Sequence, residues 1–261
     1  MRIASLQPSV TLTLAALGRL DALCAHTKYC VEAMSSLAEL QLPIVVDSWS
    51  TTTTELDTIR PDLVIASVPY RLESLAAILK AGIPVLALAP HTLEDVLQDT
   101  LLIARQVDRV QEAETLIADF RKALADAKGA TLNLKKKRVY CEEWGKPLIH
   151  SQRWIAELIE SCGGIFLGTP GARTTPEAVA EADPDLMIFA WCGAGDRVPL
   201  ERVVAQRDWH NLRAVCDRKV FCIPDEYLNT PAIPSLKQGL IHLGVAIHPE
   251  RFADANRLIS L

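Results

Sequence analysis

Short apolar runs alternate with segments of helical periodicity along almost the whole chain. The runs are nearly continuous in apolar residues and have the length of buried strands. They cover residues 3–6, 44–46, 63–66, 85–89, 138–142, 186–190 and 220–223. Strands of this kind, separated by helices, are typical of parallel sheets that are covered on both faces. The pattern therefore predicts an α/β fold.

Two stretches far apart in the chain repeat one pattern. Residues 55–65 and 177–188 each combine a short helix with an acidic first turn, a Pro-Asp break and a buried strand. Between them, apolar positions spaced by threes and fours predict one face of a long helix. These positions are Val110, Ala113, Ile117, Phe120, Leu124 and Ala127. We therefore expect two Rossmann-like lobes with mainly parallel sheets, joined by a single long backbone helix, which is the architecture of a clamp.

The expected domain boundaries follow from this repeat. The first lobe takes residues 1–91, the helical connection takes 92–134, and the second lobe takes 135–261. A helix of about 20 residues spans roughly 30 Å. Because its charges are dense, only one stripe is left to bury, so we expect a strut rather than a core helix.

Charge and hydropathy limit the kinds of partner that the chain is expected to have. The chain has 261 residues and a formal net charge of −5, and its basic run at 135–138 directly precedes a predicted strand. This favours a solvated loop and no nucleic-acid partner. No window approaches the roughly 18 apolar residues of a membrane span. A predicted strand follows Met1 and Arg2 at once, without signal-peptide regions, so the chain as written is expected to be cytoplasmic; it would be periplasmic or extracellular if a leader has been removed.

The chain lacks the common catalytic motifs. It has no phosphate loop, dinucleotide fingerprint, nucleophile elbow or zinc helix, and the Gly-Ala-Gly segment 193–195 is interpreted as a turn. Seven cysteines without a C-x-x-C pair indicate reduced thiols. His26, His91 and His150 lie near predicted strand ends, where we expect ordinary hydrogen-bonded histidines rather than metal ligands. We predict no catalytic residue, no catalytic cofactor and no metal site.

Aromatic residues gather just behind the predicted strands and apolar runs. They are Tyr29, Trp49, Tyr70, Trp144, Trp191 and Tyr227. Ligands of open α/β sheets bind beyond the carboxyl ends of the strands, and Trp and Tyr offer broad apolar faces with polar tips. A cleft lined by these rings suits a large, partly flat organic ligand. The alternative is that single tryptophans plug the ends of the sheets.

Several short motifs are spread over nearly the whole chain. They are Ser5-Leu6-Gln7-Pro8-Ser9, Tyr29-Cys30, Asp47-Ser48-Trp49-Ser50, the segment 61–66, Glu143-Trp144 with Pro147-Leu148, Trp154, Cys162-Gly163-Gly164 and His248-Pro249-Glu250. Together they resemble the vitamin B12-binding proteins of ABC importers. Those proteins belong to the helical-backbone class of substrate-binding proteins, with siderophore, haem and some metal-ion binders.

The resemblance implies site residues on both lobes. The positions that match the ligand-lining residues of the family are Tyr29, Trp49, Trp144, Trp154, Asp225 and Tyr227. It also implies that Glu55 and Glu177, one on each lobe, dock onto arginines of a membrane permease. The alternative for each glutamate is that it only complements a helix dipole.

These observations predict a non-enzymatic substrate-binding protein that holds a corrinoid (cobalamin-like) ligand between the lobes, for ABC-type import or cytoplasmic handling. The predicted ligand contacts are Tyr29, Trp49, Tyr70, Trp144, Trp154, Arg173, Trp191, Asp225 and Tyr227. Asp225 and Arg173 would serve the polar periphery of the ligand.

Two alternatives stay open. In the first alternative the ligand is a ferric siderophore, haem or a metal ion. A chelate would favour contacts with Arg71, Arg153 or Arg173. A bare ion would need three or four converging ligands. In the other alternative the protein is an enzyme on the same scaffold. Its acid or base would be Glu142, Glu143 or Asp225.

Overall fold

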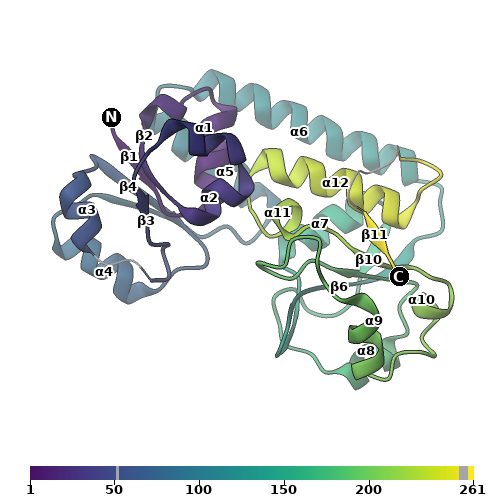
Figure 1. Cartoon of the computed structure of the whole chain (residues 1–261). Helices are drawn as coiled ribbons and strands as arrows, with labels where there is room; N and C mark the ends of the chain where they lie inside the picture. The colour runs from purple at the N-terminus through teal and green to yellow at the C-terminus, as the bar shows by residue number, and fades with distance from the viewer. Residues whose placement is uncertain (51–52, 253–257) are drawn as a thin grey trace. The chain divides into compact units, whose positions relative to one another are not determined.

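In a computed structural model the chain forms two compact units, and the division between them falls within one long helix (Figure 1). The structure describes residues 1–50, 53–252 and 258–261. Unit 1 comprises Met1–Ala118 and Pro231–Pro234, and unit 2 comprises Asp119–Thr230 and Ser235–Leu261. The dividing helix, α6 (Val110–Thr131), has 22 residues, which corresponds to about 33 Å. The expected domain boundaries near residues 91 and 135 stay predictions.

Unit 1 is built on a sheet of five parallel strands in the order β3-β2-β1-β4-β5 among the described residues. The strands are β1 (Ile3–Ser5), β2 (Leu23–Thr27), β3 (Ile44–Val45), β4 (Leu63–Ser67) and β5 (Val85–Leu88). The helices are α1 (Pro8–Ala16), α2 (Lys28–Ala33), α3 (Thr53–Ile59), α4 (Leu72–Lys80) and α5 (Leu93–Gln106), with 3₁₀ turns at Leu20–Ala22 and Ser35–Leu40.

The inner strand β4 is buried on both faces. Leu63 and Ile65 pack in a cluster with apolar side chains of α1 and α5. The alternate residues Val64 and Ala66 pack in a second cluster with α3 and α4. Because side chains alternate along a strand, this requires helices on both sides of the sheet, as the continuous apolar runs predict.

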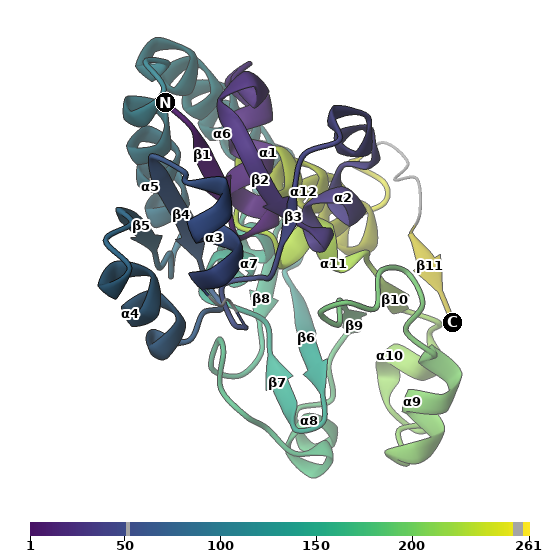
Figure 2. The same cartoon turned by 60° about the vertical axis from the view of Figure 1, so that its left-hand side comes forward.

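Unit 2 contains a mixed sheet in the order β11-β10-β9-β6-β7, with β8 also paired to β6. The strands are β6 (Lys137–Gly145), β7 (Leu148–His150), β8 (Gly164–Phe166), β9 (Leu186–Phe189), β10 (Val220–Cys222) and β11 (Ile259–Ser260). The helices are α7 (Arg153–Ser161), α8 (Pro176–Ala182), α9 (Leu200–Gln206), α10 (Arg213–Cys216), α11 (Asp225–Leu228) and α12 (Ile233–Ile247). Strands β8 and β9 pair parallel with β6, and β10 pairs parallel with β9. Strand β7 folds back antiparallel on β6 (Figure 2), and β11 pairs antiparallel with β10.

The sheet of unit 2 is also buried on both faces. Tyr140, Met187 and Phe189 join a cluster with apolar residues of α8 and α9. The alternate residues Val139 and Ile188 are fully buried too, as are the apolar residues of α7. The sheet therefore has the two covered faces of an α/β fold.

The predicted fold class is confirmed: the chain has two lobes with mainly parallel sheets, and each of the seven predicted strands corresponds to an observed one. Strand β2 was missed as a strand, because its last residues, His26 and Thr27, are polar although they are 2% and 1% exposed. In α6 the predicted stripe is buried at Ala113, Phe120 and Ala127. Within the described residues, no helix combines the length and apolar character that crossing a membrane requires.

Candidate functional site

In unit 1, the carboxyl ends of the strands hold one exposed tryptophan beside an arginine. Trp49 follows β3 and is 47% exposed, and the Arg71 guanidinium lies 5.1 Å from the centroid of its ring. The Ser74 hydroxyl donates to the Trp49 carbonyl at 3.3 Å. These residues, with Ser50 and Glu73, line an open pocket of about 740 Å³. The pocket combines an aromatic face with a cation–π partner.

A buried hydroxyl fixes the two loops that form this pocket. Ser48 is fully buried and donates to the Pro69 carbonyl at 3.0 Å. Gln7 donates from Nε2 to the Ser48 hydroxyl at 2.7 Å and to the Pro69 carbonyl at 3.1 Å. The motifs around Gln7 and Ser48 therefore have a local structural role, which is to hold the loops that present Trp49 and Arg71.

The two tyrosines predicted for this lobe lie outside that pocket's lining. Tyr29 is 38% exposed in the first turn of α2, with the Lys28 ammonium 4.8 Å from its ring centroid. Tyr70 is half-buried and packs against the cluster under α3 and α4. Ligand contact by Tyr29 and Tyr70 stays a prediction.

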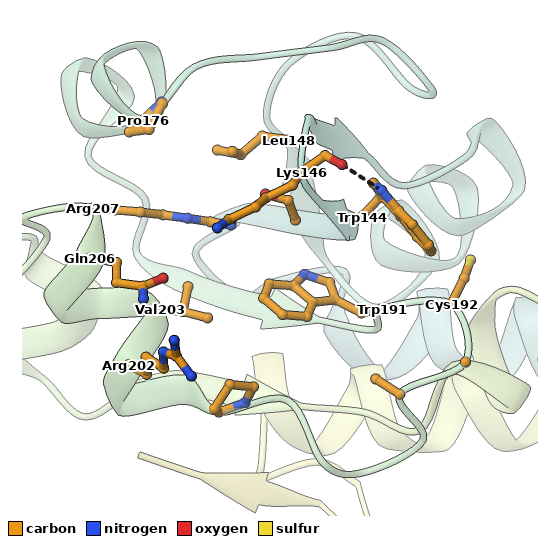
Figure 3. Close-up of a pocket in the computed structure, with 14 residues that line it drawn as sticks. Trp144, Lys146, Leu148, Pro176, Trp191, Cys192, Arg202, Val203, Gln206 and Arg207 are labelled. Atoms are coloured by element: carbon orange, nitrogen blue, oxygen red, sulfur yellow. Dashed lines mark hydrogen bonds between the residues drawn. The ribbon is translucent and has the colours of Figure 1, made fainter.

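In unit 2, Trp144 and Trp191 line one pocket of about 810 Å³ (Figure 3). Trp144 lies near the end of β6, and Trp191 follows the end of the neighbouring strand β9. The Trp144 indole donates to the Lys146 carbonyl at 2.8 Å, and Leu148 adds an apolar wall. A pocket of this size with an apolar lining is of the kind that takes small organic molecules.

Trp191 is held in place by a close approach of the backbone. A methyl group at Gly145 would lie 2.5 Å from Cζ2 of Trp191, so only glycine leaves room for the indole. The Trp191 Nε1 also donates to the Glu142 carboxylate at 2.8 Å. One wall of the pocket is therefore set by both packing and a hydrogen bond.

That carboxylate belongs to a buried polar network. Glu142 is fully buried, and Arg207 donates to its two oxygens at 2.8 and 2.9 Å. The Tyr140 hydroxyl donates to the same carboxylate. Burial and this carboxylate raise the pKa of Tyr140, which keeps the phenol protonated as a donor. The Arg207 guanidinium also lies 4.8 Å from the ring centroid of Trp209. A buried ion pair is tolerated when its hydrogen bonds are satisfied in this way.

Asp225 has a local structural role, and its predicted contact with ligand amides stays a prediction. Its carboxylate accepts from the backbone N–H groups of Gly193 and Gly195 at 2.8 and 2.7 Å. Burial raises the pKa of Asp225, and these two donors oppose that shift. The turn predicted at 193–195 is present, and Gly193 lines the pocket of Trp144 and Trp191. Asp225 therefore orders a loop of the pocket wall.

The prediction for Trp154 is wrong. Its side chain is 4% exposed and its Nε1 donates to the Leu228 carbonyl at 2.9 Å, so neither its face nor its polar tip is free for a ligand. Arg173 is exposed and forms a bridge to Ile149, and Tyr227 is half-buried with its ring 4.8 Å from His242. Neither lines the pocket of Trp144 and Trp191, and their ligand contacts stay predictions.

Two further titratable groups lie at the pocket: Cys192 is part of its lining, and Glu143 lies outside the lining. Burial raises the pKa of Glu143 to about 7, although Gln152 donates to its carboxylate at 2.6 Å. Desolvation and the carboxyl groups of Glu143 and Asp225 raise the pKa of the Cys192 thiol to about 12. Cys192 therefore stays a thiol, whereas Glu143 changes charge near neutral pH.

The structure gives the predicted docking glutamates local partners. Glu55, in the first turn of α3, accepts from the Val46 N–H at 3.0 Å. Glu177 is exposed in the first turn of α8, and its own N–H and the Thr175 hydroxyl lower its pKa. The contacts of Glu177 fit the helix-terminus alternative, whereas that of Glu55 joins α3 to the segment after β3. Permease docking stays a prediction.

Sequence reasoning missed the cations of the unit 2 pocket. Lys146, Arg202 and Arg207 all line it. Arg202 and Arg207 lie on and just after α9, more than fifty residues from Trp144, and no motif marks them. Lys146 lies inside the Glu143–Leu148 motif, where a search for basic residues next to the tryptophan would have found it. No group of three His, Cys, Asp or Glu in the described residues could hold a metal ion.

Two α/β units with aromatic-lined pockets at their strand ends define a binding protein of the two-lobed class. The chain belongs to the family described as periplasmic binding protein, whose model matches residues 3–227.

Individual relatives bind different ligands. The molybdate-binding protein MolA of Haemophilus influenzae is 26% identical over 230 residues, which cover 76% of this chain and 64% of that protein. The vitamin B12-binding protein of Vibrio parahaemolyticus is 25% identical over 181 residues, which cover 66% of this chain and 64% of that protein. The chain thus spans less than two thirds of the length of these curated relatives.

A solved structure shows the same fold. The crystal structure of a periplasmic heme binding protein from Pseudomonas aeruginosa superposes with a TM-score of 0.87 at 20% identity, covering 99% of this chain and 97% of that one.

Proposed function

We propose that the protein is the substrate-binding component of an ABC importer and that it holds a large, partly flat organic ligand, in first place a corrinoid. The main support is that Trp144 and Trp191 line one pocket at the ends of two neighbouring strands. Trp49 beside Arg71 adds a second aromatic pocket in unit 1. The predicted place of the ligand, between the two lobes, stays a prediction.

Different observations favour the corrinoid and its alternatives. The relative from Vibrio parahaemolyticus is a vitamin B12-binding protein, which favours a corrinoid. A haem or ferric siderophore is favoured by Arg71. Of the three arginines predicted to contact a chelate, Arg71 is the one that lines either of the two pockets described above. Arg153 instead pairs with Glu157 and Glu160 on its own helix.

We also propose that the protein has no catalytic activity. Two of the three carboxyl groups that an enzyme would use are engaged: Glu142 binds Arg207, and Asp225 binds the backbone of the 193–195 turn. Glu143 has a pKa suited to proton transfer, but Gln152 is its hydrogen-bond partner and the adjacent Cys192 is a protonated thiol. Turnover of a bound ligand that Asp225→Asn abolished would revive the enzyme alternative.

The proposed partner is an ABC permease, with Glu55 and Glu177 as docking residues. The periplasmic description of the family favours a protein that works outside the cytoplasm over cytoplasmic handling of the ligand.

Calorimetric titration with cobalamin, hemin, a ferric siderophore and molybdate tests the ligand. We expect saturable binding of cobalamin, and Trp144→Ala should weaken it roughly tenfold or more, because an aromatic contact of this kind contributes about 1–3 kcal/mol. Trp144→Phe, which keeps a ring, should recover part of the affinity. Absence of cobalamin binding at high micromolar concentration, with hemin or molybdate bound, would remove the corrinoid and leave the binding-protein role.

A further inference from the structure

The pocket of Trp144 and Trp191 is lined by positively charged side chains, although the chain as a whole is acidic. Its lining includes Lys146, Arg202 and Arg207, and no Asp or Glu. The chain as a whole has a net charge of −5. A cation-rich pocket on an acidic protein creates a local positive potential that attracts anions.

Only one of the three cations is neutralised. Arg207 donates to both oxygens of the buried Glu142. Lys146 and Arg202 are exposed and have no ion-pair partner among the described residues. Figure 3 shows both side chains at the pocket with the indole of Trp191. The pocket therefore keeps about two positive charges next to an aromatic wall.

Two carboxyl groups near the pocket, those of Asp225 and Glu143, are engaged by neutral donors. Asp225 accepts from Gly193 and Gly195. Glu143 is bound to Gln152, and burial raises its pKa to about 7, so it is only partly ionised at neutral pH. Neither side chain belongs to the pocket lining.

We infer that this pocket, whose lining residues all belong to unit 2, binds a compact aromatic anion: a molecule of two or three fused rings with a carboxylate, sulfonate or phosphate group. The rings would lie on Trp144 and Trp191, and the acidic group would face Lys146 and Arg202. A volume of about 810 Å³ suits a ligand of that size without a contribution from unit 1. The inference rests on the proposed role of this pocket as a ligand site, and it assigns the pocket a ligand that is smaller than a corrinoid and negatively charged, so it is tested apart from the titration with cobalamin.

A pair of fluorescent probes separates the rings from the charge. Anilinonaphthalene sulfonate and phenylnaphthylamine share their aromatic skeleton, and only the first has a negative group. We expect the sulfonate to bind the wild-type chain more tightly. The double variant Lys146→Gln/Arg202→Gln should lose roughly tenfold in affinity for the sulfonate and little for the neutral probe. Trp144→Ala should weaken the binding of both probes.

The control is Lys80→Gln/Arg105→Gln, which removes two exposed cations of unit 1 and changes the net charge equally. It should leave both affinities unchanged. Added salt should weaken the binding of the sulfonate probe and not that of the neutral probe, because salt screens only the contact between charged groups.

Three outcomes overturn the inference. Equal binding of both probes, unaffected by Lys146→Gln/Arg202→Gln, would end the charge assignment and leave the proposed function intact. Sulfonate binding that neither this double variant nor Trp144→Ala changes would locate the anion elsewhere. Absence of binding by either probe would end the inference, and the calorimetric titration with cobalamin would test the proposed function separately.

Discussion

The indole of Trp191 lies directly over the backbone of Gly145, where an added methyl group would come within 2.5 Å of Cζ2. Glycine at 145 is thus a condition for the observed position of Trp191 in the pocket wall. The contact joins the last residue of β6 to the second residue after β9, and these two strands are neighbours in one sheet.

Gly145→Ala should therefore change the pocket more than the fold. The methyl group would push Trp191 away from Glu142, and we expect the affinity for an aromatic ligand to fall about tenfold with a loss of stability of about 1–3 kcal/mol. Gly129→Ala is the matched control, because nothing lies within 4 Å of its added methyl group in α6. That change should leave binding intact and stabilise the helix by about 0.5–1 kcal/mol. Urea unfolding and ligand titration measure both effects; unchanged affinity in Gly145→Ala would show that Trp191 does not contact the ligand.

The ion pair of Glu142 and Arg207 should be a major contributor to the stability of unit 2. Arg207→Met leaves a fully buried carboxylate without its two charged donors, and breaking such a pair costs about 3–5 kcal/mol. The double variant Glu142→Gln/Arg207→Met should recover part of this loss, because the uncompensated charge is gone.

Arg213→Met provides the comparison for that experiment. Arg213 pairs with Asp183 and Asp185 but is 49% exposed, so its removal should cost less than that of Arg207. Chemical denaturation of the four proteins gives the ranking. Equal losses for Arg207→Met and Arg213→Met would contradict the buried-pair assignment.

The strand-end tryptophans show how far the sequence leads. Trp144 and Trp191 could be assigned to one site because parallel strands end at the same edge of a sheet, and β6 and β9 are indeed neighbours. Trp154 could have been excluded by the same reading, because it lies four residues before Leu158 on the apolar stripe of α7. Its identity as an aromatic outweighed its periodicity.

The rest of the pocket depends on packing that no short pattern encodes. Arg202 and Arg207 reach it from the α9 region, and which face α9 presents is set by the burial of Val203 and Val204 against the sheet. Asp225 was predicted as a ligand contact only, and its hydrogen bonds to two backbone N–H groups about thirty residues away were not predicted. Such pairings arise only once the strands are ordered.

Glu143 should make the stability of the protein depend on pH. Burial raises the pKa of Glu143 to about 7 from its ordinary value of 4.5, so the folded state binds more protons than the unfolded state between these values. The stabilisation is fully present below about pH 4.5 and is lost as the pH rises through 7, by an amount on the order of 2 kcal/mol. Glu143→Gln keeps a hydrogen-bonding side chain and should remove this share of the pH dependence.

Asp99 supplies the control for this titration, because burial raises its pKa to about 6 in unit 1. Asp99→Asn should remove its own share at lower pH and leave the loss near pH 7 in place. Unfolding free energies of the three proteins from pH 4.5 to 8.5 separate the two groups. A curve for Glu143→Gln that runs parallel to the wild type would mean that Glu143 is solvated.

The docking role of Glu55 and Glu177 can be separated from their local roles by matched changes on the same helices. If the two carboxylates contact arginines of a permease, Glu55→Gln/Glu177→Gln should reduce stimulation of the importer's ATPase by the loaded protein and leave ligand affinity unchanged. Asp57→Asn/Glu181→Gln removes equal charge from exposed positions of α3 and α8 and should leave the stimulation unaffected. The loss of ATPase stimulation should be largest at low ionic strength, because salt screens contacts between exposed carboxylates and arginines. If both double variants lower the stability alike and neither lowers the stimulation, the two glutamates act only on the first turns of their helices.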